Sequence, residues 1–413
     1  MDRRVVITGM GALSPIGNTV DKMWKNAKKG LCGIANITRY DTTNQKVKLA
    51  GEIKDLDLLE YFDKKEIRTM DNFTQYAVIA SREAIKQSAL NLKEEDLKRC
   101  GVIISSGVGG LEIIEREHSR GMEKGFDKVS PYFIPMCICN MAAATVAIEL
   151  GFKGTCSCNV TACAGGTNAI GDALRQIRHG YSDVIICGGT ESTITPLALG
   201  GFTALKALSE TNDVNRASIP FDKERNGFVL GEGAGILVLE EYNHAINRGA
   251  EILGEVAGYG ASCDAYHMTS PIPDGSGAAD CMLEAIEDAG ETVDKVDYIN
   301  AHGTSTYLND KCETLAIKNV LGEHSKKVLV SSTKSMTGHL LGAAGGIEAI
   351  LTIMAIKEGF IPPTINYKVA DEECDLDIVP NQGRKADIKF ALSNSLGFGG
   401  HNGTIALKKY CGK

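Results

Sequence analysis

The sequence predicts an α/β fold in which strands and helices alternate along the 413 residues of the chain. Short runs rich in Val and Ile, such as those that begin at Val5 and Val184, have the length and composition of buried strands. Longer segments, such as 72–88, place apolar residues three and four positions apart, which is typical of helices. Glycine-rich turns separate the two kinds of segment. This alternation favours largely parallel strands covered by helices.

The individual elements follow from the same two patterns. Strands are expected at residues 5–8, 101–105, 184–187, 236–239, 255–260, 296–301, 328–332, 390–393 and 404–407. Helices are expected at residues 21–29, 72–88, 141–150, 169–177, 242–248, 277–290, 309–321 and 347–356. Residues 115–135 are polar and lack a clear period, which suggests an irregular surface insertion. The segment 394–402, NSLGFGGHN, is predicted to be a loop because it is rich in glycine.

A faint internal repeat divides the chain into two halves. The helix expected to end near Ile177 and the one expected to end near Ile356 each follow a turn of small residues, and these two isoleucines are 179 positions apart. A chain of this length suits two domains or one doubled α/β unit. We therefore expect two similar halves, residues 1–250 and 251–413, with the strand-end loops of both facing one site.

Composition excludes several classes of function. A net charge of −8 argues against nucleic acid as a partner. The opening MDRRVVITGMG lacks the apolar stretch of a signal peptide, and the thirteen cysteines are odd in number, so reduced thiols in the cytoplasm are expected. The Cys-x-Cys spacings do not match a zinc site, and no metal is expected. The apolar helix at 347–356 contains Glu348 and is too short to insert into a membrane.

The segment TACAGG, residues 161–166, has the features of a nucleophile site. The pattern around it predicts a strand, a tight turn and a helix, with Cys163 at the start of the helix. A helix N-terminus presents unpaired N–H groups and a partial positive charge, and both stabilise a thiolate. Cys163 is therefore a candidate nucleophile.

Three further strand-end loops contain residues that match one chemistry. They are AHGTST with His302, KSMTGH with Lys334 and His339, and GFGGHN with Phe398. A thiolate can accept an acyl chain, while two histidine N–H groups can hold the oxygen of a second thioester as that acid loses carbon dioxide. Simple hydrolysis requires instead one histidine oriented by an Asp or Asn, and no such third group is evident. The pattern favours carbon–carbon bond formation.

These motifs resemble the β-ketoacyl-acyl carrier protein synthases of the thiolase superfamily, most closely the synthase II type of fatty acid synthesis. The resemblance extends from VVITGMGALSPIG to NSLGFGGHNGTIAL. It implies a thiolase-like fold in which the two α/β halves form a layered αβαβα core. It also implies that Cys163, His302 and His339 are the catalytic triad, supported by Lys334 and Glu348. The backbone N–H groups of Cys163 and Phe398 correspond to the oxyanion hole.

The resemblance also implies substrate contacts and partners. Thr304 and Thr306, with Thr269, match residues that hold the phosphopantetheine arm, while Val108, Phe202 and the ring of Phe398 match the acyl pocket. Lys64, Lys65, Arg68 and Lys206, with Lys124 and Lys128 as further candidates, form a possible docking surface for an acidic acyl carrier protein. A homodimer is expected, and no cofactor, because the phosphopantetheine arrives on the carrier.

The expected reaction is therefore a decarboxylative Claisen condensation of malonyl-acyl carrier protein with an acyl group on Cys163. Two alternatives stay open. A ketosynthase of a type II polyketide pathway would use the same residues on other substrates. A non-catalytic chain-length subunit would share the fold but would lack the nucleophile that Cys163 provides.

Overall fold

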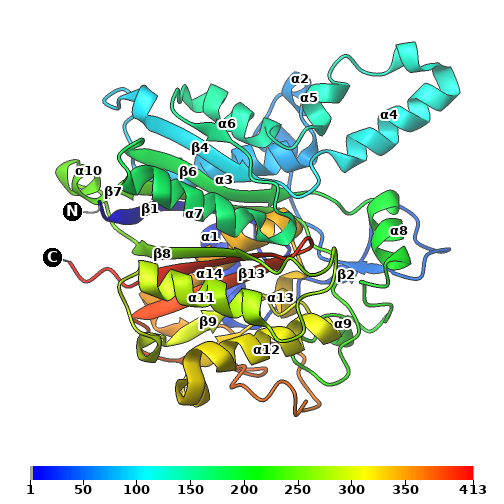
Figure 1. The fold of residues 1–413 in the computed structure, drawn as a ribbon. Helices are drawn as coiled ribbons and strands as arrows, with labels where there is room; N and C mark the ends of the chain where they lie inside the picture. The colour runs from blue at the N-terminus through cyan, green and yellow to red at the C-terminus, as the bar shows by residue number, and fades with distance from the viewer. Residues whose placement is uncertain (1–2, 413) are drawn as a thin grey trace.

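Ten strands form one hydrogen-bonded sheet in the computed structural model, which describes residues 3–412 (Figure 1). Its first half has the order β5 (Cys156–Ser157), β4 (Cys100–Ser105), β6 (Val184–Glu191), β7 (Gly233–Glu241) and β1 (Val5–Leu13). Its second half has the order β10 (Leu329–Ser331), β9 (Tyr298–Asn300), β13 (Phe390–Gly397), β14 (His401–Lys408) and β8 (Gly254–Cys263). The halves join where β1 pairs with β8.

Both halves repeat one pattern of strand directions. The three strands farthest from the junction are parallel, and the remaining pairings are antiparallel. The expectation of largely parallel strands is therefore wrong for the centre of the sheet. The chain enters β7 through the long segment 192–232, and β13 and β14 form a hairpin, so neither β7 nor β14 follows the single crossover helix that parallel neighbours need.

Helices cover both faces of each half, which produces five layers (Figure 1). Helices α3 (Asn72–Ser88) and α6 (Met141–Leu150) pack outside the first half, and α11 (Ser276–Asp288) and α12 (Tyr307–Leu321) outside the second. Helices α7 (Gly165–Arg178) and α14 (Ala344–Glu358) lie between the halves and contact strands of both. The layered αβαβα core expected from the resemblance is confirmed.

The hydrophobic core follows these layers. One buried cluster surrounds the two central helices and includes side chains from both halves of the sheet. A second cluster lies between α3, α6 and the first half, and a third between α11, α12 and the second half. Helix α14 is buried along almost its whole length, so its uniform apolar composition reflects a central layer and not a membrane. Across residues 3–412, no helix combines the length and hydropathy needed to cross a bilayer.

The remaining helices and two small sheets lie outside the five layers or connect them. The other α-helices are α1 (Val20–Lys28), α2 (Lys64–Ile67), α4 (Leu111–Lys124), α5 (Phe133–Cys137), α8 (Pro196–Ala204), α9 (Val214–Ala217), α10 (Tyr242–Asn247) and α13 (Lys334–Thr337). Two small sheets pair β2 (Ala35–Asn36) with β3 (Leu49–Ala50) and β11 (Phe360–Ile361) with β12 (Arg384–Lys385).

The two central helices begin in matching ways. Helix α7 follows a 3-10 turn at Ala162–Ala164, and α14 follows one at Leu341–Ala343. The first residue of each turn is non-glycine with a left-handed backbone, φ 48° at Ala162 and 47° at Leu341. These positions are 179 residues apart, the same offset that relates Ile177 to Ile356 in the sequence. The two halves therefore share the local geometry that starts each central helix.

The segment expected to be an irregular insertion is largely helical. Helix α4 covers Leu111–Lys124 and projects from the body of the protein in Figure 1. Its buried positions are Ile113, Glu117 and Gly121, spaced four residues apart. The hydrophobic pattern hides this helix because two of its three buried residues are not apolar. Glu117 is satisfied by the Ser130 N–H at 2.7 Å.

The loop predicted at 394–402 is also shorter than expected. Strand β13 continues to Gly397 and β14 begins at His401, so only Phe398, Gly399 and Gly400 form the turn. Both glycines have positive φ, 86° and 74°, which a tight hairpin turn requires. Phe398 is therefore fixed at the tip of a hairpin and not within a long loop.

Candidate active site

A cavity of about 470 Å³ lies where loops from both halves meet. Its walls include Cys163 from the turn before α7, His302 from the loop after β9, and His339 from the loop after α13. All three side chains are almost completely buried. The structure thus brings the three candidate catalytic residues to one cavity, although up to 176 positions separate them in the sequence.

Backbone geometry places Cys163 at the base of this cavity. The residue lies in the 3-10 turn at Ala162–Ala164, directly before Gly165 begins α7. Ala162 adopts φ 48°, a left-handed conformation that a residue with a Cβ rarely occupies. Such strain is typically found where a functional side chain must be held in one position.

The tip of the β13–β14 hairpin packs against this turn. The Phe398 backbone N–H lies close enough to the Cys163 sulfur to lower the pKa of the thiol. Gly397 makes the approach possible, because a Cβ there would lie 2.9 Å from the Thr161 carbonyl oxygen and 3.2 Å from the Cys163 nitrogen. Two backbone N–H groups, those of Cys163 and Phe398, therefore lie together at the nucleophile.

The two histidine rings are neighbours. Their centroids are 5.2 Å apart and their planes are nearly perpendicular, at 87°. Nδ1 of His302 and both ring nitrogens of His339 have no hydrogen-bond partner among residues 3–412. Burial lowers the pKa of both imidazoles well below the ordinary value, and the positive charge of Lys334 lowers it further. Each ring is therefore neutral at pH 7 and has one N–H to donate.

Separate contacts hold each histidine backbone. Glu313 on α12 accepts hydrogen bonds from the N–H groups of His302 and Gly303, both at 2.8 Å. The His339 N–H donates to the Val229 carbonyl at 2.7 Å, and the His339 carbonyl accepts from Gly231. The segment 200–235, which shows no periodic pattern in the sequence, therefore helps to position His339.

Lys334 and Glu348 form an ion pair behind the histidines. Both side chains are buried, and Lys334 Nζ contacts Glu348 Oε1. Burial raises the pKa of Glu348 to about 7, although the Lys334 ammonium opposes that rise. Neither residue lines the cavity. Lys334 therefore acts on the site through its electric field and not by direct contact with the cavity.

The charge state of Cys163 differs from the expectation based on a helix start. Burial raises the pKa of the Cys163 thiol to about 12, even though the Lys334 charge and the Phe398 N–H both lower it. Glu191, a buried acid at the end of β6, raises it further. Desolvation outweighs the helix N-terminus here, so Cys163 is a thiol at neutral pH and must lose its proton to react.

The structure also places the predicted substrate contacts on this cavity. Its lining includes Val108, Phe202, Thr269, Thr304, Thr306 and Phe398. The Thr304 and Thr306 hydroxyl oxygens lie 2.9 Å apart and share a hydrogen bond. The rings of Phe202 and Phe398 are 6.5 Å apart, so they form adjoining parts of one apolar wall.

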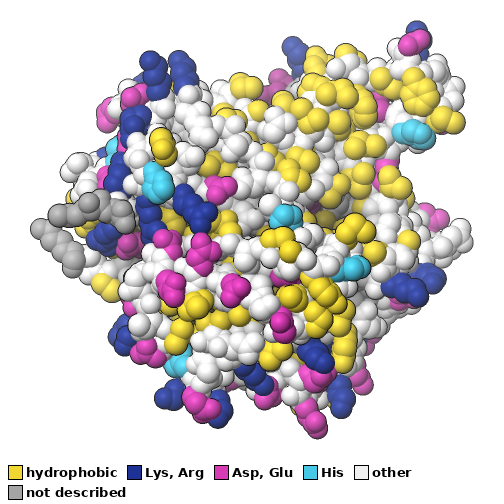
Figure 2. All heavy atoms as spheres, in the orientation of Figure 1, with side chains coloured by type: hydrophobic (Ala, Val, Ile, Leu, Met, Phe, Trp, Pro, Cys, Tyr) yellow, Lys and Arg dark blue, Asp and Glu magenta, His cyan; other side chains and the backbone are white. Residues whose placement is uncertain are grey.

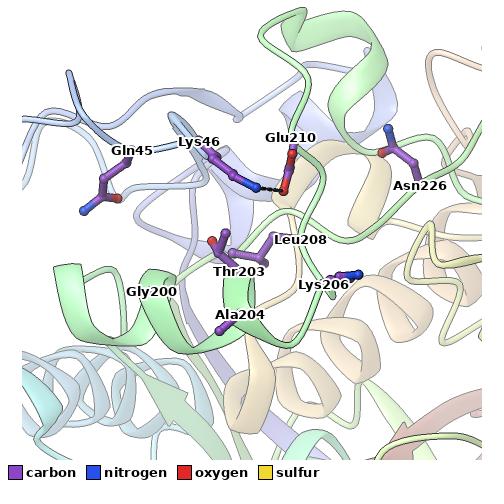
Figure 3. A pocket seen from close by; sticks show the side chains of 9 residues that line it. All are labelled: Gln45, Lys46, Gly200, Thr203, Ala204, Lys206, Leu208, Glu210 and Asn226. Carbon is purple, nitrogen blue, oxygen red and sulfur yellow. Dashed lines mark ion pairs between the residues drawn. The ribbon is translucent and has the colours of Figure 1, made fainter.

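The candidate docking residues lie in two separate places. Lys206 lines the mouth of the cavity and also a neighbouring open hollow of about 880 Å³. Figure 3 shows Lys46 paired with Glu210 on one side of this hollow and Lys206 on another. Lys64, Lys65 and Arg68 are exposed on and beside α2, which Figure 1 places at the top of the molecule, away from α8. Of the further candidates, Lys124 is exposed at the end of α4 and Lys128 is exposed in the 3-10 turn that follows it.

Sequence reasoning missed several residues of this site. The Phe228 ring packs edge-on against His339 at 5.3 Å and against Phe202 at 5.4 Å. Glu313 is a buried acid in an otherwise ordinary helical pattern, and Glu191 ends a strand. An acidic residue at a position where the pattern predicts burial is the only local signal that could have identified either carboxylate.

Within the described part of the chain, no group of three or more His, Cys, Asp or Glu side chains is arranged to hold a metal ion.

Comparisons with known proteins agree with this geometry. Residues 2–245 match the family described as beta-ketoacyl synthase, N-terminal domain, and residues 253–368 match the beta-ketoacyl synthase, C-terminal domain. The 3-oxoacyl-[acyl-carrier-protein] synthase 2 of Synechocystis sp. is 53% identical over 409 residues, covering 99% of this chain and 98% of the relative. The protein of the same name from Staphylococcus aureus (strain COL) is also 53% identical, covering 99% of both chains.

Solved structures extend the similarity. A type II PKS acyl-carrier protein complex with its ketosynthase, bound to the hexaketide, contains a chain with a TM-score of 0.92 and 36% identity, covering 99% of this chain and 100% of that one. A beta-ketoacyl synthase from Burkholderia phymatum has a TM-score of 0.91 and 33% identity, with the same coverage.

The buried Cys163 thiol leads to a pH prediction. Because its pKa is about 12, the thiolate fraction should rise about tenfold per pH unit between pH 6 and 9, without a plateau. The rate of iodoacetamide alkylation at Cys163, quantified on its tryptic peptide, checks this. The exposed Cys411 serves as an internal reference for the reagent. A plateau with a midpoint below pH 8 would contradict the burial argument.

Proposed function

Because the chain belongs to the β-ketoacyl synthase family, we propose that it catalyses a decarboxylative Claisen condensation in fatty acid elongation. An acyl group held on Cys163 reacts with malonyl-acyl carrier protein to give a 3-oxoacyl-acyl carrier protein two carbons longer and carbon dioxide. The observation that supports this most directly is the meeting of one thiol, two neutral imidazoles and two N–H groups at a single cavity.

The first half-reaction loads the enzyme. Cys163 gives up its proton, and a neutral imidazole in the same cavity is a suitable acceptor for it. The sulfur then attacks the acyl thioester carbonyl. The N–H groups of Cys163 and Phe398 stabilise the oxyanion of the tetrahedral intermediate, the carrier thiol leaves with a proton, and an acyl-Cys163 thioester remains.

The second half-reaction forms the carbon–carbon bond. The malonyl carboxylate leaves as carbon dioxide, and its bonding electrons pass to the α-carbon and the thioester oxygen. His302 and His339 donate N–H groups to that oxygen as the negative charge develops. The α-carbon attacks the acyl-Cys163 carbonyl, and the Cys163 sulfur leaves. The same two N–H groups stabilise the oxyanion in both half-reactions.

The neighbouring residues have supporting roles in this proposal. Lys334, paired with Glu348, keeps both imidazoles neutral and favours the thiolate. The hydroxyls of Thr304 and Thr306 bind the phosphopantetheine arm, with Thr269 near its entrance. The acyl chain lies against Val108, Phe202 and the ring of Phe398. No metal or organic cofactor is needed, because the carrier protein supplies the phosphopantetheine.

The relatives favour fatty acid synthesis over a polyketide pathway. Identity is 53% with proteins named 3-oxoacyl-[acyl-carrier-protein] synthase 2, but 36% with the type II polyketide ketosynthase. The non-catalytic chain-length subunit is disfavoured because Cys163, His302 and His339 are all present at one cavity.

Two substitutions of Cys163 test the condensation. Cys163→Ala should lower acyl elongation at least about 1,000-fold, because no thioester can form. Cys163→Gln should lose elongation equally but retain malonyl decarboxylation, since its amide resembles the acylated cysteine. Release of labelled carbon dioxide and mass analysis of the product measure the two activities. Cys411→Ala, which removes an exposed thiol outside the cavity, is the control. Elongation at the wild-type rate by Cys163→Ala would refute the assignment.

We also propose that the acidic carrier protein docks at the mouth of this cavity. Lys206 is exposed and lines both the cavity mouth and the adjoining hollow. Opposite charges steer such a partner to the entrance. Lys64, Lys65 and Arg68 are exposed but lie outside the cavity lining, so they would contact the carrier protein away from the entrance.

Charge reversal at Lys206 tests the docking. Lys206→Glu should raise the KM for carrier-bound substrate about tenfold at low salt, with a smaller effect at high salt. The rate with a small soluble acyl thioester should change less than twofold, because that substrate has no acidic surface. Steady-state kinetics with both substrates measure the difference, and Lys385→Glu on the exposed strand β12 is the control. Equal effects on both substrates would mean that Lys206 does not serve docking.

A homodimer is the assembly we propose. Strand β5 is the exposed edge of the first half of the sheet, and exposed apolar side chains lie on the neighbouring elements. They are Met122, Phe126, Tyr132, Ile134, Ile138 and Ile148. Figure 2 shows hydrophobic side chains gathered on the part of the surface that Figure 1 assigns to α4 and α5. A large exposed apolar patch marks an interaction site, and an unpaired strand edge beside it can pair with another chain.

Sedimentation tests this assembly. The protein should sediment as a species of about twice 44.1 kDa at micromolar concentration. The double variant Ile134→Asp and Ile148→Asp should shift it toward the monomer, because two charges would then be buried in the contact. Leu283→Asp, a change of a half-exposed leucine on α11, should leave the species unchanged. A wild-type monomer would contradict the proposal.

Two further expectations belong to this proposal. Residues 1–250 and 251–413 act as two halves, the first with the nucleophile and the second with both histidines. The protein works in the cytoplasm, which is supported by thirteen cysteines that are all free thiols.

A further inference from the structure

One buried carboxylate in this site has no role in the reaction as proposed. Glu191 is the last residue of β6 and is completely buried. It accepts four hydrogen bonds. Its Oε1 binds the Ser106 hydroxyl at 2.9 Å and the Val108 N–H at 3.3 Å, while its Oε2 binds the Gly107 N–H at 2.8 Å and the Gly342 N–H at 3.0 Å.

These donors come from both halves of the protein. Ser106, Gly107 and Val108 follow β4 in the first half, whereas Gly342 lies in the 3-10 turn before α14 in the second. Burial raises the pKa of Glu191, and the four hydrogen bonds lower it. Three backbone N–H groups and one hydroxyl therefore donate to the Glu191 carboxyl group, which joins the two loops.

Two glycines leave the space that the Glu191 carboxyl group needs. A Cβ on Gly107 would lie 2.8 Å from Glu191 Oε2, and a Cβ on Gly342 would lie 2.9 Å from the same oxygen and 2.5 Å from the Gly107 nitrogen. Any side chain at either position would displace the carboxylate or separate the loops. Two glycines from different halves are therefore required for the clamp that Glu191 closes.

The second half of the protein uses the same device. Glu313 accepts the N–H groups of His302 and Gly303 in the loop after β9, as Glu191 accepts those of Gly107 and Val108 in the loop after β4. Strands β4 and β9 occupy the same place in their halves of the sheet. One buried carboxylate thus positions a catalytic histidine, and the other positions a loop that lines the cavity.

The clamped loops form part of the cavity wall that faces the acyl chain. Gly107 and Val108 line the cavity, as does Leu341, the residue before Gly342. His339 is three residues before Gly342 in the same loop. A change in the length or direction of the Glu191 side chain would therefore move the acyl-pocket wall relative to the nucleophile.

We propose that Glu191 is a positioning residue that sets the acyl-chain preference of the site by clamping the Val108 loop to the Gly342 turn. It does not contact substrate. Its effect passes through Val108 and Leu341, which do line the cavity. This inference rests on the condensation proposed above, and it concerns which acyl groups bind and not whether the reaction occurs.

Two substitutions test the length of the Glu191 side chain and its carboxyl group one at a time. Glu191→Gln can place its amide oxygen where Oε2 lies and keep the bonds from Gly107 and Gly342. Its NH2 group then faces the Ser106 hydroxyl, which can turn to accept, so only the long 3.3 Å contact with Val108 is lost. Glu191→Asp keeps the carboxyl group but shortens the side chain by about 1.5 Å, one C–C bond, and breaks the clamp.

The experiment measures acylation of Cys163 by a graded series of acyl-carrier protein donors, from short to long chains, with intact-mass detection and full-length protein. The wild type is run in parallel, together with Glu191→Gln, Glu191→Asp and Glu191→Ala. Glu251→Asp, a change of an exposed acid on the surface, is the matched control. Thermal unfolding of each variant identifies any that fails to fold, and the Gln and Asp variants still decide the question if the Ala variant does.

The clamp predicts a distinct pattern. Glu191→Asp and Glu191→Ala should change the ratio of KM values between the longest and shortest accepted donors at least about fivefold, the effect of losing a buried hydrogen bond. Glu191→Gln should stay within about twofold of the wild type. A merely structural role would instead lower the active fraction, which reduces kcat equally for every donor and leaves the KM ratio unchanged.

Two results would overturn the inference. One is a Glu191→Asp profile that matches the wild type, which would show that the reach of the side chain is irrelevant. The other is a Glu191→Gln defect as large as that of Glu191→Ala, which would show that charge and not reach matters. Failure of the wild type itself to acylate Cys163 would count against the condensation and so remains distinguishable from both.

Discussion

The packing of α7 against α14 between the two halves of the sheet is the contact on which the rest of the site depends. Each helix begins from a 3-10 turn with a left-handed first residue, and the two turns lie next to each other. The first turn contains Cys163 and places it at the cavity. The second turn begins two residues after His339 and so determines the path of the chain there. The tip of the β13–β14 hairpin then adds the Phe398 N–H. The reacting groups are held by backbone, and their side chains have little freedom to move.

This arrangement also explains the electrostatics. The site is buried between the two sheet halves, and this burial drives the thiol and both imidazoles toward their neutral forms. The Lys334 charge opposes this effect for the thiol and reinforces it for the two imidazoles, and Glu348 pairs with Lys334 behind the rings. The helix N-terminus that the sequence suggests as the source of a thiolate is the weaker influence. Neutral imidazoles suit the proposed chemistry better than charged ones, because each keeps one N–H donor and one acceptor.

The sequence predicted the parts of this site that depend on local pattern. Cys163 before a helix and His302 after a strand follow from short motifs, and the 179-residue offset follows from two similar helix ends. His339, expected directly after a strand, instead follows the short helix α13, which contains Lys334. The sequence could not predict the antiparallel centre of the sheet, because strand direction depends on long connections such as 192–232. It also missed α4, whose buried stripe contains a Glu and a Gly, and Glu191 and Glu313, whose partners are backbone N–H groups that leave no trace in the sequence.

The doubled scaffold has a consequence for the number of reaction centres. Gly342 stands at the position equivalent to Cys163, and its N–H corresponds to the one that would stabilise an oxyanion in the first half. In the second half that N–H already donates to a buried side chain, the Glu191 carboxyl group, at 3.0 Å. The N–H group of the second turn is thus already bound by a side chain of the protein itself. The two matching turns therefore differ in use: the first presents Cys163 to the cavity, and the second binds a buried side chain that joins the two halves.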